Sequence, residues 1–170
     1  MVKDMDTQLT LVFGADHGGF VRKGELMAWV KELGYQIQDA GAFQLETQDD
    51  YPKFAKATVE AVQQRRMRGE DALGILVCRS GGGMTIAANR FPGIRAVSAI
   101  NTEMAHHGRA HNNANVVVLS GDWTNIDEMK RILQTFLDTP FSGEPRHLRR
   151  VAQLDGLVER AVDAQGLSHE

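Results

Sequence analysis

Residues 75–84 read Ile-Leu-Val-Cys-Arg-Ser-Gly-Gly-Gly-Met, and this segment decides how the rest of the chain is interpreted. Its apolar beginning predicts a buried strand that ends in Cys78, the only cysteine of the protein. The glycines predict a tight turn into a helix. A thiol between a strand end and a helix N-terminus lies where backbone N–H groups and the helix dipole favour a thiolate, the reactive form of cysteine. An inert buried cysteine is the alternative. Because packing alone does not require three adjacent glycines, we favour a functional thiol.

Length and composition indicate one ordinary domain. The chain has 170 residues, 42% of them hydrophobic, which is enough for a full core. A net charge of −3 without a basic stripe argues against nucleic acid as a partner. No apolar run approaches the roughly 20 residues of a membrane span, and residues 1–8 resemble neither a signal nor a transit peptide. A single cysteine permits no internal disulfide, so we expect a cytoplasmic protein.

Short apolar segments alternate with longer helical patterns along the chain. In the first helix we expect Leu26, Val30 and Leu33 to face inward and Gly34 to cap the end, and Thr102 is the expected N-cap of the fourth helix. The alternation predicts an α/β fold with a five-stranded parallel sheet covered by helices on both faces. The predicted strands are Leu9–Phe13, Tyr35–Gln38 (an edge strand), Leu73–Val77, Ile94–Ala99 and Val116–Leu119, and the predicted helices are Val21–Leu33, Phe54–Arg68, Gly83–Arg90, Thr102–His111 and Ile126–Leu137.

The chain changes character between Pro140 and Pro145, where a break precedes a further amphipathic helix that starts near Arg146. Its apolar stripe must be covered either by a partner subunit or by the chain's own sheet, and the pattern leaves both open. We therefore expect a flexible N-terminus (1–8), an αβα domain (9–139), a C-terminal helical extension (140–165) and a fraying tail (166–170). The stripe consists of Val151, Leu154, Leu157, Val158, Ala161 and Val162.

Polar side chains follow the predicted strands at the edge where ligands bind in doubly wound sheets. Asp16 and His17 follow the first strand, Cys78 and Ser80 end the third, and His111 ends the helix after the fourth. We expect these side chains to converge on one rim of the sheet. A lone histidine or loop aspartate usually has a structural role, but their joint occurrence at strand ends predicts a reactive site.

Other sites fit the sequence less well. The segment Gly14–Gly19 lacks the Gly-x-Gly-x-x-Gly pattern of dinucleotide binding, and Met84 stands where a cysteine phosphatase loop needs its arginine. A metal site remains an alternative, because His107 and His111 can share a helix face with Glu103 one turn earlier. The sequence shows no further residue that would complete the metal coordination, so we expect no metal.

The ordered motifs of the chain resemble the family of ribose-5-phosphate isomerase type B and galactose-6-phosphate isomerase, which are sugar-phosphate isomerases. The resemblance runs from about Leu11 to about Arg150, which is most of the chain. It rests on Gly14-Ala-Asp-His-Gly-Gly-Phe20, Asp50-Tyr-Pro52, Cys78-x-Ser-Gly-x-Gly-Met-x-Ile-Ala-Ala-Asn89, Gly93-Ile-Arg-Ala96, Arg109-Ala-His-Asn-Asn-Ala-Asn115 and Arg146-His-Leu-Arg-Arg150.

This resemblance implies a Rossmann-like three-layer αβα sandwich that acts as a homodimer or dimer of dimers, with each active site at the subunit interface. It implies neither a metal nor an organic cofactor. The implied reaction interconverts an aldose phosphate and a ketose phosphate through an enediolate, on ribose 5-phosphate or a related pentose, tetrose or hexose phosphate. By position, the resemblance implies that Cys78 is the base and that Ser80 and the amides of Gly81, Gly82 and Gly83 hold the enediolate oxygen. It implies that His111, with Asp16 nearby, opens the sugar ring and that Asn112 binds a sugar hydroxyl. His17 then contacts the phosphate, and Arg146 and Arg150 of the neighbouring subunit clamp it.

The chain departs from this family at three positions. Arg79 stands where the family commonly has glycine, Gly82 where it has an aliphatic residue, and Asp122 where it has an arginine facing the phosphate. We include Arg79 and Asp122 among the expected substrate-binding residues. Arg79 either supplies positive charge from another direction or pairs with Asp122, or else the substrate differs: a shorter or longer sugar phosphate, or a sugar acid. The alternative functions are a non-catalytic subunit or sugar-phosphate sensor and, more remotely, a cysteine acyl transferase.

Overall fold

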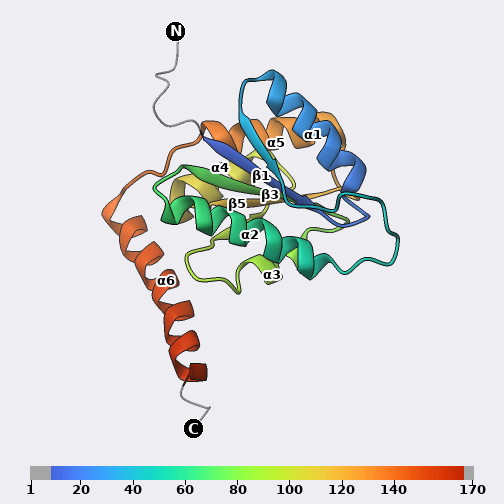
Figure 1. Ribbon diagram of the computed structural model, residues 1–170. Coiled ribbons are helices and arrows are strands. Elements are labelled where there is room, and N and C mark those ends of the chain that lie inside the picture. Colours follow the sequence, from blue (N-terminus) through green and yellow to red (C-terminus); the bar gives the residue numbers. More distant parts are fainter. Residues whose placement is uncertain (1–8, 167–170) are drawn as a thin grey trace.

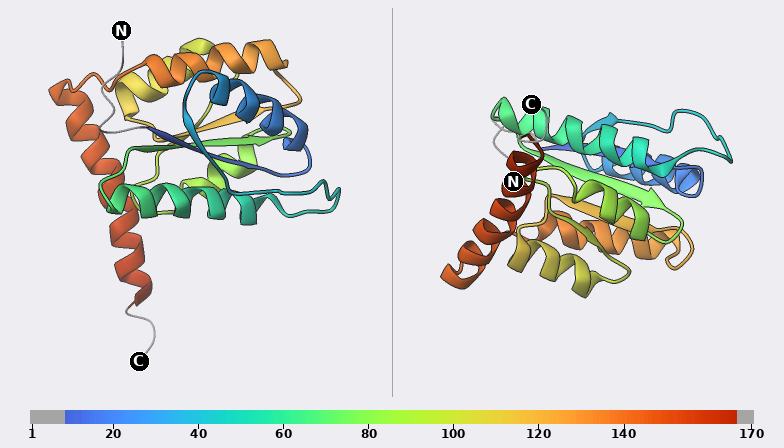
Figure 2. Two further views of the ribbon diagram at one scale, coloured as in Figure 1. Left: turned by 45° about the horizontal axis from the view of Figure 1, so that its top comes forward. Right: turned by 90° about the horizontal axis from the view of Figure 1, so that it is seen from below.

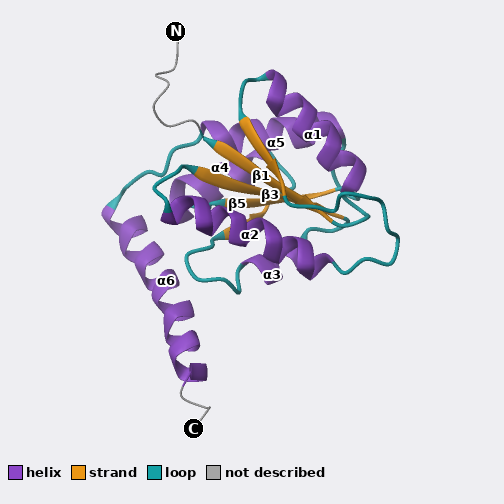
Figure 3. Ribbon diagram, in the orientation of Figure 1, coloured by secondary structure: helices purple, strands orange, loops and turns teal. Residues whose placement is uncertain are grey.

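The chain folds into three layers, a β-sheet between two layers of helices, and one further helix projects from them (Figure 1). The computed structural model describes residues 9–166, with side chains as far as Leu157. All strand pairings are parallel, in the order β2-β1-β3-β5-β4. Figure 3 distinguishes the strands of the sheet from the helices that cover it. The strands are β1 (Thr10–Ala15), β2 (Gln36–Asp39), β3 (Ala72–Cys78), β4 (Ala96–Ser98) and β5 (Val116–Ser120), and the helices are α1 (Phe20–Glu32), α2 (Tyr51–Met67), α3 (Gly82–Ala88), α4 (Thr102–Asn112), α5 (Ile126–Asp138) and α6 (Pro145–Gly166).

The three central strands, β1, β3 and β5, are buried along their whole length. Unbroken apolar strands of this kind are typical of a parallel sheet covered on both faces. One core, which includes Phe13 and Phe136, joins the sheet to α1, α4 and α5, and the other, which includes Val12 and Met84, joins it to α2 and α3. The predicted α/β fold, with its five-stranded parallel sheet and extra C-terminal helix, is confirmed.

The end of α1 differs in one detail from the prediction. Leu33 is 49% exposed and does not join the buried face, because it is the C-cap that follows the last turn. Gly34 then takes a φ of +89°, its amide donates to Lys31, and the Tyr35 amide donates to the carbonyl of Val30. This pair of bonds is a Schellman cap, which requires the left-handed conformation that glycine adopts readily.

The starts of α2 and α4 also differ from the prediction. The N-cap of α4 is Asn101, whose side-chain oxygen accepts from the Met104 amide at 2.8 Å, so Thr102 is the first helical residue and not the cap. Helix α2 begins at Tyr51 and not at Phe54, because proline is tolerated in the first turn of a helix, where its missing N–H has no intrahelical partner anyway.

Helix α6 extends away from the three layers, as two further views show (Figure 2). Leu154 and Leu157 remain 47% and 60% exposed. The chain's own sheet therefore does not cover Leu154 and Leu157, and the alternative in which it covers the whole apolar stripe is wrong. Val158, Ala161 and Val162 of the stripe lie beyond the described side chains, and the predicted N-terminal segment and most of the predicted tail lie outside residues 9–166. Within those residues no helix has the length and apolar character needed to cross a membrane.

Candidate active site

The turn between β1 and α1 places Asp16 at the carboxyl edge of the sheet, the edge at which the parallel strands end. Asp16 is 6% exposed, and its Oδ1 accepts from the Gly19 amide at 3.1 Å. Burial raises the pKa of Asp16, although the Gly19 amide and the neighbouring His17 oppose the shift. The turn passes close to β3, since a Cβ on Gly19 would lie 2.0 Å from the carbonyl oxygen of Val77. Only glycine permits this approach.

Cys78 ends β3 and is 5% exposed. Its Sγ accepts from the amide of Gly81 at 3.1 Å, and Gly81 has a φ of +85° as the N-cap of α3. Burial raises the pKa of the Cys78 thiol, the charge of Asp16 adds to this, and the amides of Gly81, Met84 and Ser80 oppose it. The amides that the sequence predicted are in place. They do not make the thiolate the favoured form, because they only partly replace the water that burial removes.

The loops after β3 and β5 are tied together beside this thiol. The Ser120 hydroxyl donates to the Arg79 carbonyl at 2.6 Å, and the Asp122 amide donates to the same carbonyl at 3.0 Å. Nε of Arg79 lies 3.2 Å from Oδ2 of Asp122, so the pairing predicted as one alternative is present. The two side chains are 68% and 42% exposed, and such a pair contributes about 0–1 kcal/mol, so it can open for a ligand.

Sequence reasoning missed Asp49, which lies in the loop between β2 and α2. Its Oδ1 is 2.6 Å from Nδ1 of His17 and 3.2 Å from the His17 backbone nitrogen. The Asp49 side chain is 1% exposed. No motif marks this residue, because the contact joins positions 32 apart in the sequence and depends on the path of the long loop.

The structure separates the predicted site residues into two groups. Helix α4 starts after β4 at the carboxyl edge and returns across the sheet, so His111 and Asn112 lie at the opposite, amino edge. There Arg95, just before β4, donates from Nε to the carbonyl of Asn113 at 3.0 Å. The prediction that all the site residues of one chain converge on one rim is therefore wrong for His111.

His111 lies in a cluster of histidine and arginine side chains from α4 and α6. Its Nδ1 is 3.0 Å from Nδ1 of His107, and its ring centroid is 4.5 Å from that of His147. Desolvation, together with His147, His107 and Arg146, lowers the pKa of His111. Arg146 and Arg150 are both exposed on the first turns of α6. Across the described part of the chain no group of three or more His, Cys, Asp or Glu side chains is arranged to hold a metal.

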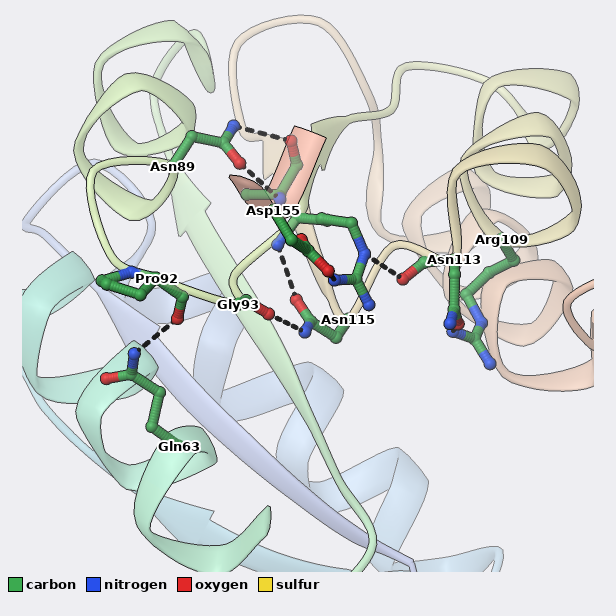
Figure 4. Close-up of polar contacts among 10 residues, drawn as sticks. Gln63, Asn89, Pro92, Gly93, Arg109, Asn113, Asn115 and Asp155 are labelled. Atoms are coloured by element: carbon green, nitrogen blue, oxygen red, sulfur yellow. Dashed lines mark hydrogen bonds and ion pairs between the residues drawn. The ribbon is translucent and has the colours of Figure 1, made fainter. Parts of the chain in front are cut away.

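A polar network anchors α6 at this amino edge (Figure 4). Nη1 of Arg95 lies 2.8 and 2.9 Å from the two carboxylate oxygens of Asp155. The Arg95 amide donates to Asn115 at 2.8 Å, and the Asn115 side chain donates to the Gly93 carbonyl at 2.7 Å. The charge-assisted contact between Arg95 and Asp155 holds α6, which carries Arg146 and Arg150, at the same edge of the sheet as His111.

Comparisons with known proteins agree with the fold. The family described as Ribose/Galactose Isomerase matches residues 11–154. The chain belongs to the ribose/galactose isomerase family. It is 38% identical over 143 residues to ribose-5-phosphate isomerase B of Mycolicibacterium paratuberculosis, which covers 84% of this chain and 87% of that protein.

Solved structures of ribose-5-phosphate isomerase B are similar over most of their length. The enzyme of Thermotoga maritima is 38% identical with a TM-score of 0.79, over 86% of this chain and 97% of that one. The enzyme of Mycoplasma genitalium, solved with bound ribulose-5-phosphate, is 29% identical with a TM-score of 0.84, over 90% of this chain and 98% of that one.

Membership in the ribose/galactose isomerase family confirms the predicted family and the predicted enzyme class, an aldose–ketose isomerase. In this isomerase the predicted site residues at or just beyond the ends of β1, β3 and β5 form the carboxyl-edge group, which consists of Asp16, His17, Cys78, Arg79, Ser80, Gly81, Gly82, Gly83 and Asp122. The amino-edge group consists of His111, Asn112, Arg146 and Arg150.

Proposed function

We propose that this isomerase interconverts an aldose phosphate and a ketose phosphate, with ribose 5-phosphate and ribulose 5-phosphate, or a related tetrose, pentose or hexose phosphate such as galactose 6-phosphate, as substrates. The observation that carries the proposal is the buried Cys78 thiol at the carboxyl edge, next to a glycine turn and under the influence of Asp16. Relatives named ribose-5-phosphate isomerase B support the substrate class, and one of them was solved with ribulose-5-phosphate.

Cys78 is the base in this proposal. As a thiolate it takes the proton from C2 of the open-chain aldose, which leaves an enediolate and a neutral thiol. The hydroxyl proton passes from O2 to O1, and the thiol then returns its proton to C1, which gives the ketose and restores the thiolate. The raised pKa of Cys78 makes the thiolate a minor species but a stronger base once it forms. The Gly81 amide holds the sulfur in place during both transfers.

The enediolate oxygen needs donors that are not already used by the sulfur. First-turn amides of a helix have no intrahelical acceptor, and Gly82 and Gly83 begin α3. These two amides and the exposed Ser80 hydroxyl are therefore the donors that we assign to the developing negative charge. One such donor is typically worth about 3 kcal/mol of activation free energy.

A second copy of the chain supplies the remaining groups. His111, Asn112, Arg146 and Arg150 lie at the amino edge of their own sheet, so we propose that they serve the Cys78 of a neighbouring subunit. The exposed Leu154 and Leu157 provide apolar surface for that contact. We therefore propose a homodimer or a dimer of dimers with each active site at a subunit interface.

In this shared site, His111 moves the proton that opens the sugar ring. The lowered pKa of His111 keeps the imidazole neutral at physiological pH, so it can accept the proton of the anomeric hydroxyl and return it to the ring oxygen. Arg146 and Arg150 suit the phosphate through forked hydrogen bonds.

The Arg79–Asp122 pair distinguishes this isomerase from the pattern of the family. Asp122 would repel a phosphate at short range, and its pairing with Arg79 offsets that charge. We propose that the pair sets the length or the charged end of the accepted sugar.

A panel of four- to six-carbon aldose and ketose phosphates tests the proposed isomerase activity, with unphosphorylated sugars as controls.

Turnover of at least one phosphorylated sugar, abolished by Cys78→Ala, is the expected result. Binding without turnover across the panel would contradict the proposal and indicate the non-catalytic alternative. Turnover that persists in the Cys78→Ala variant would contradict the assignment of the base.

A further inference from the structure

Asp49 carries a buried carboxylate that has few hydrogen-bond donors around it. Its side chain is 1% exposed, and both of its donors, the backbone amide and Nδ1 of His17, reach the same oxygen, Oδ1. Oδ2 is buried without a hydrogen-bond partner within the described residues. A buried carboxylate is costly unless a charge or strong hydrogen bonds compensate it, so the ring of His17 is the partner that matters most.

The contact also fixes the chemistry of the His17 ring. An ionised carboxylate only accepts hydrogen bonds, so Nδ1 must carry a proton at a separation of 2.6 Å. Nε2 is then the ring nitrogen left for a ligand, and the His17 side chain is 32% exposed. With one ring proton Nε2 can only accept, and with two it donates to an anion such as a phosphate oxygen. Asp16 is the other charged group that interacts with both residues.

We propose that Asp49 is a positioning residue that holds one proton of His17 on Nδ1 and stabilises the doubly protonated ring, so that Nε2 donates a charged hydrogen bond to the phosphate of the substrate. The contact to phosphate rests on the proposed function, whereas the state of the ring does not. A purely structural role for Asp49, through the His17 backbone amide, would leave the ring tautomer and the affinity for phosphate unchanged.

The first test reads the tautomer directly, by long-range ¹H–¹⁵N correlation of the histidine rings, with His17→Gln for assignment. The wild-type neutral ring should carry its proton on Nδ1. In Asp49→Asn the side-chain amide can donate to Nδ1, so a population with the proton on Nε2 should appear. Glu46→Gln is the matched control, because it removes a carboxylate from an exposed position in the same loop, and it should leave the His17 signals unchanged. A neutral wild-type ring with its proton on Nε2, or identical spectra in wild type and Asp49→Asn, would overturn the proposal.

The second test separates substrate binding from turnover. With the phosphorylated sugar that the wild type turns over, Asp49→Asn should raise KM about tenfold, because the ring without the Asp49 carboxylate donates to the phosphate as a neutral group and not as a cation. The same variant should change kcat by less than about twofold. His17→Gln should raise KM similarly, and adding Asp49→Asn to it should have no further effect, because the residues act as one unit. An unchanged KM in Asp49→Asn would overturn the contact to phosphate. If the wild type turns over no sugar phosphate, the proposed function fails, but the ring spectra still decide the role of Asp49.

Discussion

Ionisation of Cys78 is the property on which the proposed chemistry depends most, and it can be measured without interference because the protein has no other cysteine. An ordinary thiol is about 3% ionised at pH 7. Burial and the nearby Asp16 charge raise the pKa of Cys78, so a smaller fraction of this thiol is ionised at pH 7. A raised pKa means that the neutral thiol persists to higher pH. The rate of alkylation by iodoacetamide should therefore rise about tenfold per pH unit from pH 6.5 to 8.5.

The Asp16→Asn variant tests the cause of this behaviour. Removing the carboxylate removes a like charge beside the forming thiolate, so alkylation at pH 7.5 should become faster. Asp138→Asn, at the far end of α5, is the matched control and should alkylate at the wild-type rate. Cys78→Ala should take up no label.

The pH dependence of kcat/KM should follow the alkylation profile, since both report the free enzyme. An alkylation rate that levels off below pH 8 would refute the reasoning. That result would mean that the backbone amides of the glycine turn outweigh burial and hold a thiolate at neutral pH.

Three further outcomes follow from the structure. Asp122→Arg should shift the order of kcat/KM values across a sugar-phosphate panel, and an unchanged order would contradict its role in specificity. Gly19→Ala should lower the free energy of unfolding by about 2 kcal/mol in urea titrations, because the added Cβ collides with the backbone of Val77. Gly24→Ala should raise the free energy of unfolding by about 0.5–1 kcal/mol, because the added Cβ has no atom within 4 Å and alanine favours the helix. The double variant Leu154→Asp/Leu157→Asp should run as a monomer in light scattering, and an unchanged mass would contradict the α6 interface.

Hydrophobic pattern alone was sufficient to predict the layers of the fold. The apolar run that ends in Cys78 is buried on both faces, and its alternation with amphipathic helices leaves a parallel sheet as the consistent arrangement. Helix ends were harder to place, because Asn101 and Thr102 are both good capping residues and only the backbone conformation distinguishes them.

The site was predicted in part, for two physical reasons. Residues that directly follow a strand, such as Asp16, lie at the carboxyl edge by topology alone. His111 was placed wrongly because a helix after a strand returns to the opposite edge, so its last turn faces a different end of the sheet. Asp49 was missed because its contact with His17 depends on the course of a long loop, which no local pattern encodes.

The measurement that tests the central claim most directly is complementation between two inactive variants, Cys78→Ala and His111→Asn, refolded together in equal amounts. If each active site combines Cys78 of one chain with His111 of another, half of the dimers are mixed and each has one intact site. Isomerase activity should then return to about a quarter of the wild-type value. Mixed dimers that form, as native mass spectrometry would show, but stay inactive would contradict the account, because the two residues would then have to act within one chain.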